Sequence, residues 1–342
     1  MPRALLVSSN DYNPWFNLAL ESLLMERVEQ GLLNAVLYLW QNDNTVVIGR
    51  NQNAWAECNT GRLEADGGRL ARRSTGGGAV YHDLGNLNFS IILPRSAFSI
   101  DRNFELLLAV VESQGISAVR SGRNDILVNG CKFSGNAFSL KRKAGLHHGT
   151  LMVQSDYERL ARYLTVSPDK LKAKGVSSVS ARVVNLQSVE PSLTVNKLKV
   201  SMENLFVRFF CQEADWQIER CDDFVFRSDP RLQVLEAHYT DWSWRYGETL
   251  AFDAAVSKRF LWGQVQLGFL VKEGRVGQVK VYSDALDSDY ISSLPQRLMG
   301  CRFHSSELAG SLLAFQDSTD IVDTPRRQMT EDLASLIKAQ NW

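Results

Sequence analysis

The sequence predicts an α+β protein whose large domain carries a largely antiparallel or mixed sheet. Short apolar runs separated by turn residues recur through the first 150 positions, and helical patterns interrupt them irregularly rather than after every strand. The pattern changes near Phe252, where cleanly alternating strands and two further helical patterns begin. We therefore expect two domains, residues 1–247 and a small C-terminal α/β domain over residues 252–342.

The first elements follow from local signals. Asn13-Pro14 is typical of a helix start, with an N-cap followed by proline in the first turn, and Gly31 ends that helix. Apolar runs at 35–40 and 45–48 surround four polar residues, which predicts a hairpin. Strand-like segments also flank the three glycines that follow.

A second hairpin has a stronger signal. Asn129-Gly130 is the turn dipeptide that most favours a tight hairpin, and short apolar runs flank it. Lys132 therefore has a fixed strand position two residues past a rigid turn. Helices are predicted at 104–112, 157–164 and 195–210, with a strand at 146–153.

The C-terminal domain begins with alternating residues at 265–271 that turn at Glu273-Gly274 and alternate back through 279–281. Helical patterns follow at 291–299 and 330–338.

Composition excludes several classes of function. The net charge of +0 over 342 residues gives no broad field for nucleic acid or an anionic membrane. No run of about 18 uncharged apolar residues could span a bilayer, and no leader pattern precedes the first strand, so we expect a cytoplasmic protein. Five scattered cysteines without a C-x-x-C pair favour a reducing compartment. The five histidines show no H-x-x-x-H pattern and no cysteine at zinc spacing, which argues against a structural zinc site.

The segment from Arg72 to Asp83 contains the most informative motif, two arginines followed by Gly76-Gly77-Gly78. Bare glycine backbone can converge its N–H groups on an anion, which favours a phosphate or carboxylate site. The alternative is a flexible loop, but the flanking strands place the glycines on a scaffold. Neither the P-loop pattern nor the dinucleotide fingerprint occurs, so a nucleotide would be held in another way.

Single residues leave alternatives open. Lys132 could supply a point charge to a developing anion, or be a solvated strand lysine. Asp125 could bind Mg²⁺ or cap the turn after Gly122, and the cap is favoured. His82 and His148 could act as base or donor, although a satisfied core histidine is the favoured interpretation for His148.

In combination, these motifs resemble the lipoate–protein ligase A family within the biotin/lipoate ligase fold. The resemblance covers nearly the whole chain, and its combination of motifs is specific although each motif alone is weak. The matching segments are 13–19, Trp40 with 45–53, 57–59, 72–83 with Gly85-Asn86, 121–125, 132–135, 147–151, 174–176 with 180–186, and 242–247.

The resemblance implies an enzyme that converts ATP and lipoate to lipoyl-AMP and pyrophosphate, then transfers the lipoyl group to a lysine ε-amine. The implied partners are lipoyl domains of 2-oxoacid dehydrogenase E2 subunits and the glycine-cleavage H protein, and we expect a monomer. Mg²⁺ would accompany the phosphates, with Asp125 as a candidate ligand. The physical chemistry agrees, because a lysine between a carboxylate and a polyphosphate offsets their repulsion.

The resemblance also implies roles for particular residues. Lys132 is the expected catalytic residue and would contact both the lipoate carbonyl and the α-phosphate. The residues expected to bind ATP are Arg73, Gly76, Gly77, Gly78, Ala79, Val80, Tyr81 and Lys132. Those expected to line the lipoate slot are Lys132, Arg50, Asn51, Val47, His82 and Gly77.

Several rival functions share the fold. A cysteine-dependent octanoyltransferase would need a cysteine after the helix at 157–164, where residues 164–168 contain none, and Cys131 lies on the opposite strand face from Lys132. A lipoyltransferase that accepts preformed lipoyl-AMP would keep the same pocket. A biotin ligase is disfavoured because its Gly-Arg-Gly-Arg loop is missing. A catalytically silent binding module would not need Arg73, the glycines and Lys132 together.

Overall fold

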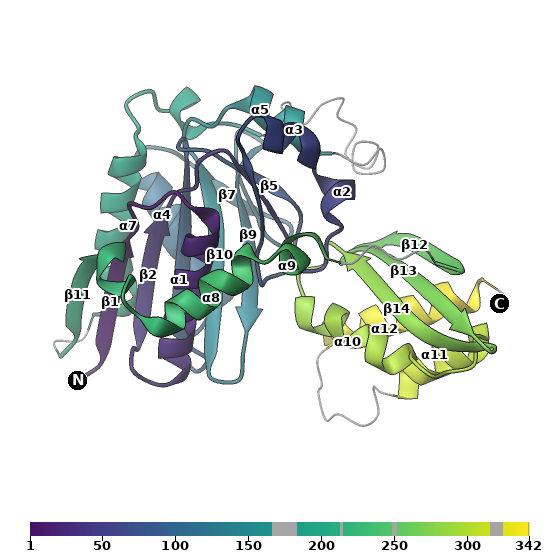
Figure 1. The fold of residues 1–342 in the computed structure, drawn as a ribbon. Coiled ribbons are helices and arrows are strands. Elements are labelled where there is room, and N and C mark those ends of the chain that lie inside the picture. Colours follow the sequence, from purple (N-terminus) through teal and green to yellow (C-terminus); the bar gives the residue numbers. More distant parts are fainter. Residues whose placement is uncertain (166–182, 213–214, 248–251, 315–323, 341) are drawn as a thin grey trace. The chain divides into compact units, whose positions relative to one another are not determined.

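The computed structural model describes residues 1–165, 183–212, 215–247, 252–314, 324–340 and 342, and Figure 1 traces them. The chain forms two compact units. The large unit comprises Met1–Ile48, Ala54–Arg73 and Ala79–Tyr246. The small unit comprises Gly247–Trp342 together with Gly49–Asn53 and Ser74–Gly78. Two loops from the N-terminal part of the sequence thus pack with the C-terminal residues.

The large unit is built on an eight-stranded mixed sheet. β1 pairs in parallel with β11 and β2, whereas the remaining pairs are antiparallel. This arrangement confirms the predicted α+β class. The strand order is β11 (Gln217–Asp222), β1 (Arg3–Ser8), β2 (Ala35–Trp40), β6 (Asn86–Pro94), β10 (Ala144–Met152), β9 (Cys131–Leu140), β8 (Asp125–Val128) and β7 (Val119–Ser121).

A second sheet of three strands corrects one sequence prediction. β3 (Thr45–Ile48) lies between β4 (Arg69–Arg72), to which it is parallel, and β5 (Val80–His82), to which it is antiparallel. The hairpin predicted from 35–40 and 45–48 is wrong. β2 is buried along its whole length and both of its edges are taken by β1 and β6, so no edge remains for β3.

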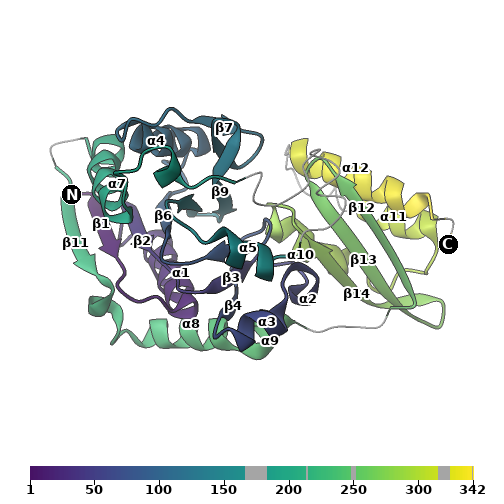
Figure 2. The ribbon, with the colours of Figure 1, turned by 90° about the horizontal axis from the view of Figure 1, so that it is seen from above.

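Helices cover both faces of the large sheet, as Figure 2 shows. α1 (Pro14–Glu29) and α8 (Pro230–Thr240) pack on one face, and α4 (Ile100–Glu112) and α7 (Val195–Phe210) on the other. α1 starts as predicted, because the Asn13 side chain accepts a hydrogen bond from the Trp15 N–H at 3.0 Å. The core of the large unit therefore has two apolar layers separated by the sheet.

Short helices complete the large unit. α3 (Thr60–Ala65), α5 (Tyr157–Tyr163) and α9 (Trp242–Tyr246) contribute buried residues to a third cluster, which packs on the three-stranded sheet. The other short elements are α2 (Ala54–Glu57), η2 (Leu186–Ser188) and η3 (Asp223–Phe226).

The small unit has its own core. β12 (Ala254–Phe260), β13 (Gly263–Lys272) and β14 (Arg275–Ser283) form an antiparallel sheet that packs with α10 (Ser288–Leu298), α11 (Ser305–Ala314) and α12 (Thr324–Lys338). Glu273 and Gly274 both have positive φ, +52° and +71°, as the predicted two-residue turn requires. α11 was not predicted from the sequence.

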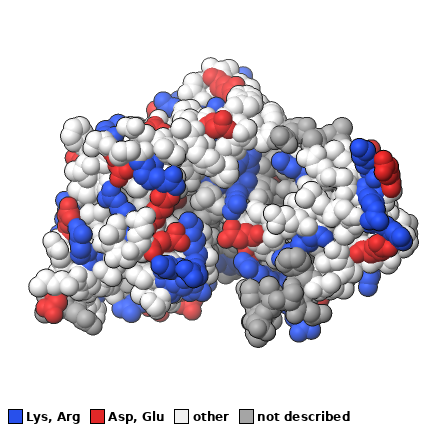
Figure 3. All heavy atoms as spheres, turned by 60° about the horizontal axis from the view of Figure 1, so that its bottom comes forward, with Lys and Arg blue, Asp and Glu red and all other residues white. Residues whose placement is uncertain are grey.

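Two general features bear on function. Within the described ranges, no helix is long and apolar enough to cross a membrane. Acidic and basic side chains are intermixed on the face drawn in Figure 3, in line with the net charge of +0.

Candidate functional site

Arg73 is a buried cation that directly follows β4. Its N–H donates to the Ile48 carbonyl oxygen at 3.0 Å, and its Nη1 donates to the Val47 carbonyl oxygen at 3.3 Å. Only 7% of the residue is exposed. Burial lowers the pKa of Arg73 to about 10, and the carboxylate of Glu21 opposes that shift. The guanidinium therefore keeps its charge at neutral pH.

Glu21 is the counter-charge that sequence reasoning missed. It lies on the buried face of α1 and is 1% exposed. Nδ1 of His148 lies 2.8 Å from its Oε2, and the Ser90 hydroxyl donates to the same oxygen. The indole nitrogen of Trp40 in turn donates to Ser90 Oγ at 3.1 Å. A carboxylate on the apolar side of the predicted helix was the available sequence signal.

His82, at the end of β5, presents a buried donor. The Asn42 side-chain amide donates to its Nδ1 at 3.1 Å, so the ring proton is on Nε2. Nε2 has no hydrogen-bond partner among the described residues. Burial, with Arg73 and His148 nearby, lowers the pKa of His82 to about 3. The neutral ring can donate one hydrogen bond to a ligand oxygen.

The glycine segment belongs to the small unit. The Gly77 N–H donates to the Ala285 carbonyl oxygen at 3.1 Å, and Gly77 has a φ of +94°. A Cβ on Gly76 would lie 2.1 Å from that same oxygen. No described atom lies within 4 Å of a Cβ placed on Gly78. Gly76 is thus needed for packing and Gly77 for its positive φ, whereas the surroundings of Gly78 leave room for a side chain.

The other loop of the small unit holds two of the predicted lipoate-slot residues. Arg50 pairs with Asp289 at 2.9 Å. The Asn51 side chain donates to the Ser288 carbonyl oxygen at 3.1 Å and accepts from the Ser292 hydroxyl at 3.2 Å. Both side chains are therefore engaged by residues of α10.

The remaining predicted contacts lie on the three-stranded sheet. Val47 is 1% exposed and pairs with Val80, which is partly buried like Ala79. The Tyr81 hydroxyl donates to Asn44 Oδ1 at 3.1 Å, and burial raises its pKa to about 12. Tyr81 is thus a neutral residue of the third apolar cluster.

Lys132 lies on the hairpin predicted from the sequence. Asn129 and Gly130 have φ of +51° and +78°, which matches a tight two-residue turn. Nζ of Lys132 lies 2.6 Å from Oδ1 of Asp125, and the two side chains are 35% and 22% exposed. Asp125 therefore carries a third role that the sequence did not indicate, the ion-pair partner of Lys132.

The described residues contain no cluster of metal ligands. In those ranges no three His, Cys, Asp or Glu side chains come together at a spacing suited to a metal ion. Asp125, the candidate ligand, directs one oxygen at an ammonium instead.

His147, the first histidine of the His147-His148 pair, has a different environment from His148. His147 Nε2 lies 2.9 Å from Asn136 Oδ1, and the rings of Phe89, Phe104 and Phe138 surround it. Burial holds its pKa well below the usual range. His147 is thus a neutral core residue.

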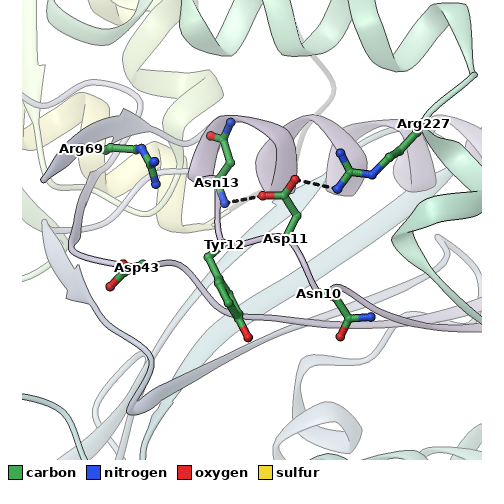
Figure 4. Close-up of a pocket in the computed structure, with 7 residues that line it drawn as sticks. All are labelled: Asn10, Asp11, Tyr12, Asn13, Asp43, Arg69 and Arg227. Atoms are coloured by element: carbon green, nitrogen blue, oxygen red, sulfur yellow. Dashed lines mark hydrogen bonds and ion pairs between the residues drawn. The ribbon is translucent and has the colours of Figure 1, made fainter. Parts of the chain in front are cut away.

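A separate polar hollow lies at the start of α1 (Figure 4). Its volume is about 380 Å³, and its lining includes none of the residues predicted to bind a ligand. Asp11 there pairs with Arg227 at 2.7 Å. The lining residues are Asn10, Asp11, Tyr12, Asn13, Asp43, Arg69 and Arg227.

The structure therefore brings together some of the predicted residues and not others. Arg73 and His82 share one buried polar cluster with Glu21 and His148, and Lys132 has a separate ion pair with Asp125. The glycines, Arg50 and Asn51 belong to the small unit. The predicted motifs at 174–176 and 180–182, and positions 166–168 where a cysteine was sought, lie outside the described residues.

Two family models match the chain. The model of the lipoyl protein ligase A/B catalytic domain matches residues 13–207. The model of the bacterial lipoate protein ligase C-terminus matches residues 249–337. The resemblance inferred from the motifs is thereby confirmed.

Solved structures of lipoate ligases are similar to this chain as well. P. falciparum LipL1 in complex with lipoate is 29% identical, with a TM-score of 0.83 over 99% of this chain and 100% of that one. A bipartite lipoate protein ligase with its E2 lipoyl domain from Thermoplasma acidophilum is 23% identical, with a TM-score of 0.59 over 74% and 99%. A lipoate-protein ligase A bound with ATP is 24% identical, with a TM-score of 0.59 over 72% and 99%. The last two likenesses show the fold.

Proposed function

This chain belongs to the lipoyl protein ligase A/B family, and we propose that it is an ATP-dependent lipoate–protein ligase. In the first step a lipoate carboxylate oxygen attacks the α-phosphorus of ATP and pyrophosphate leaves, which gives lipoyl-AMP. In the second step the ε-amine of an acceptor lysine attacks the lipoyl carbonyl. An amide forms, AMP leaves, and the amine loses one proton to solvent.

The observation that carries this proposal is the ammonium of Lys132, held by one carboxylate at the end of a rigid hairpin. Adenylation crowds a carboxylate against a polyphosphate, and a cation between the two stabilises the transition state. In the proposed reaction Lys132 contacts both the lipoate carbonyl oxygen and the α-phosphate. The ATP-bound and lipoate-bound structures similar to this chain support the choice of substrates.

We assign the nucleotide phosphates to Arg73 and to the segment that follows it. The guanidinium of Arg73 keeps its charge despite burial, because Glu21 compensates for it. ATP is bound as its Mg²⁺ complex, so the metal enters with the substrate. The backbone of Gly76, Gly77, Gly78, Ala79, Val80 and Tyr81 completes the proposed ATP site.

We assign the lipoate tail to the apolar region beside Val47. His82 supports this assignment, because its Nε2–H has no hydrogen-bond partner among the described residues and can donate to a ligand oxygen. Arg50, Asn51 and Gly77 are also proposed to contact lipoate, as the family resemblance implies.

The proposed acceptors are small lipoyl domains of 2-oxoacid dehydrogenase E2 subunits and the glycine-cleavage H protein. A bipartite ligase of similar fold has been solved with its E2 lipoyl domain, which supports the first of these. We propose that the enzyme acts as a monomer.

The test begins without an acceptor. Purified protein given lipoate, ATP and Mg²⁺ should release pyrophosphate and retain lipoyl-AMP, which native mass spectrometry would detect. Adding an apo lipoyl domain should then increase the mass of that domain by one lipoyl group. If no pyrophosphate appears above background while preformed lipoyl-AMP is transferred, the protein is a lipoyltransferase and the ligase proposal is wrong.

A further inference from the structure

The hairpin that carries Lys132 contains an irregularity. Asp125 lies opposite Gly135, and Ile126 lies opposite Ser134, but Leu127 lies opposite Lys132. Phe133 is therefore an extra residue on β9, a β-bulge. Bulges re-aim side chains and recur next to active sites.

The bulge determines on which face of the hairpin the Lys132 side chain lies. Side chains alternate along a strand, so a regular hairpin with Asp125 opposite Gly135 would place Lys132 opposite Val128. Asp125 and Lys132 would then be on opposite faces. Because the register shifts, Lys132 is on the face of Asp125, and the two side chains meet at 2.6 Å.

Gly135 leaves the space that this contact uses. A Cβ on Gly135 would lie 3.0 Å from Nζ and 3.1 Å from Cε of Lys132. Its other described neighbour within 4 Å would be Oγ1 of Thr150, at the limit of 4.0 Å. The lysine end therefore passes over Gly135 to reach Asp125, and a methyl group there would displace the ammonium with no backbone in its way.

We propose that Asp125 and Gly135 are positioning residues for Lys132. Asp125 holds the Lys132 ammonium at one place on the hairpin until the reacting carboxylate and phosphate replace Asp125 as its partner. Gly135 leaves the space through which the lysine side chain reaches that place. The inference rests on the proposed ligase function and assigns Asp125 a role other than metal binding. Orienting a catalytic group in advance removes part of the entropy cost of the reaction.

The proposal is tested with two variants that disturb the same ammonium differently. Asp125→Asn removes the carboxylate charge, and Gly135→Ala fills the space under Nζ. Asp125→Glu restores a carboxylate and should recover most of the lost activity. The matched controls are Asp101→Asn, which breaks a 2.6 Å ion pair with Arg120, and Gly61→Ala, where no described atom lies within 4 Å of the new Cβ.

The readouts are kcat and KM for pyrophosphate release, the Mg²⁺ concentration for half-saturation, and the melting temperature. We expect kcat to fall about 10- to 100-fold in Asp125→Asn and Gly135→Ala, the range that a misplaced group of ~1 Å can cause. KM for ATP, the Mg²⁺ requirement and the melting temperature should stay unchanged, because a partly exposed ion pair adds little stability.

Two results would overturn the proposal. One is an unchanged kcat in both variants of an active wild-type enzyme. The other is a loss in Asp125→Asn that saturating Mg²⁺ restores, which would make Asp125 a metal ligand. A wild-type protein that releases no pyrophosphate would instead refute the ligase function. The variants would then be compared in transfer from lipoyl-AMP, where an undiminished rate again contradicts the positioning role.

Discussion

The indole nitrogen of Trp244 donates to the carbonyl oxygen of Arg72 at 2.9 Å, and Nε of Arg72 donates back to the carbonyl oxygen of Trp244 at 2.7 Å. Arg72 Nη2 also donates to the carbonyl oxygen of Arg245 at 2.8 Å. Arg72 thus connects the end of β4 to α9, the last described helix of the large unit, through hydrogen bonds. Arg73, the second arginine of the pair, lies in the buried polar cluster instead.

Replacing Arg72 by lysine should therefore destabilise the large unit, because an ammonium cannot reproduce this fork. We expect the free energy of unfolding to fall by about 1–3 kcal/mol, the usual cost of leaving buried carbonyl groups unpaired. Urea denaturation measures it. Arg69→Lys, at the exposed start of the same strand, is the control. Equal stability of the two variants would contradict a structural role for Arg72.

Removing the Lys132 ammonium should abolish both partial reactions. Lys132→Ala should lower adenylation and transfer by a factor of about 100 to 1,000, the typical effect of losing one group that stabilises a developing anion. Lys141→Ala is the control, because Lys141 pairs with Glu29 on the surface at 3.3 Å. Quench-flow measurement of adenylation and of transfer tests this prediction. A variant that keeps more than about a tenth of the wild-type rate would refute the assignment.

The hairpin predicted at Asn129-Gly130 is present, whereas the hairpin predicted from 35–40 and 45–48 is not. The difference shows what local sequence can predict. Asn129-Gly130 determines its turn through its own backbone preference, so that hairpin was predictable. The pairing of β2 and β3 depends instead on which strands compete for each edge, and β1 and β6 occupy both edges of β2. Sequence periodicity has no information on that competition.

The buried cluster was hidden for a similar reason. Glu21 and His148 are separated by 127 positions, so no spacing rule connects them. Each alone has an ordinary interpretation, one as a polar residue in a helix and the other as a core histidine. The contact that gives them a shared role exists only after α1 has packed on β10.

The glycines should differ in their response to substitution. Gly78→Val should leave the fold intact, because no described atom lies within 4 Å of its Cβ, but should weaken ATP binding about tenfold or more if backbone must approach phosphate. Gly76→Val should instead destabilise the small unit by clashing with the Ala285 carbonyl oxygen. Calorimetry and thermal melts measure the two effects. Unchanged nucleotide affinity in Gly78→Val would exclude the phosphate-loop role.

Acid should destabilise the protein partly through His82. Its pKa is about 3 in the folded protein against 6.5 ordinarily, so below pH 6.5 the unfolded chain takes up a proton that the folded protein does not. The stability present above pH 6.5 is therefore lost as pH falls toward 3, by up to about 1.4 kcal/mol per pH unit. Urea melts should give a shallower pH slope for His82→Gln than for exposed His304→Gln, and identical slopes would contradict this account.

The apolar clusters of the two units do not share residues. Three clusters draw only on residues up to Tyr246, and the fourth draws only on residues from Val256 onward. A chain that ends after Gly247 therefore retains every described apolar cluster of the large unit. It loses, however, the partners of Asn51 and Gly77, which bond to Ser288, Ser292 and Ala285.

A chain truncated after Gly247 should therefore fold, as circular dichroism and a cooperative urea transition would report, yet bind nucleotide poorly. We expect adenylation to suffer more than transfer from preformed lipoyl-AMP, because the glycine segment loses the backbone that orders it, whereas Lys132 keeps its hairpin. Pyrophosphate release and acceptor modification are measured on the same sample. Equal losses in a demonstrably folded truncate would mean that the small unit serves both steps alike.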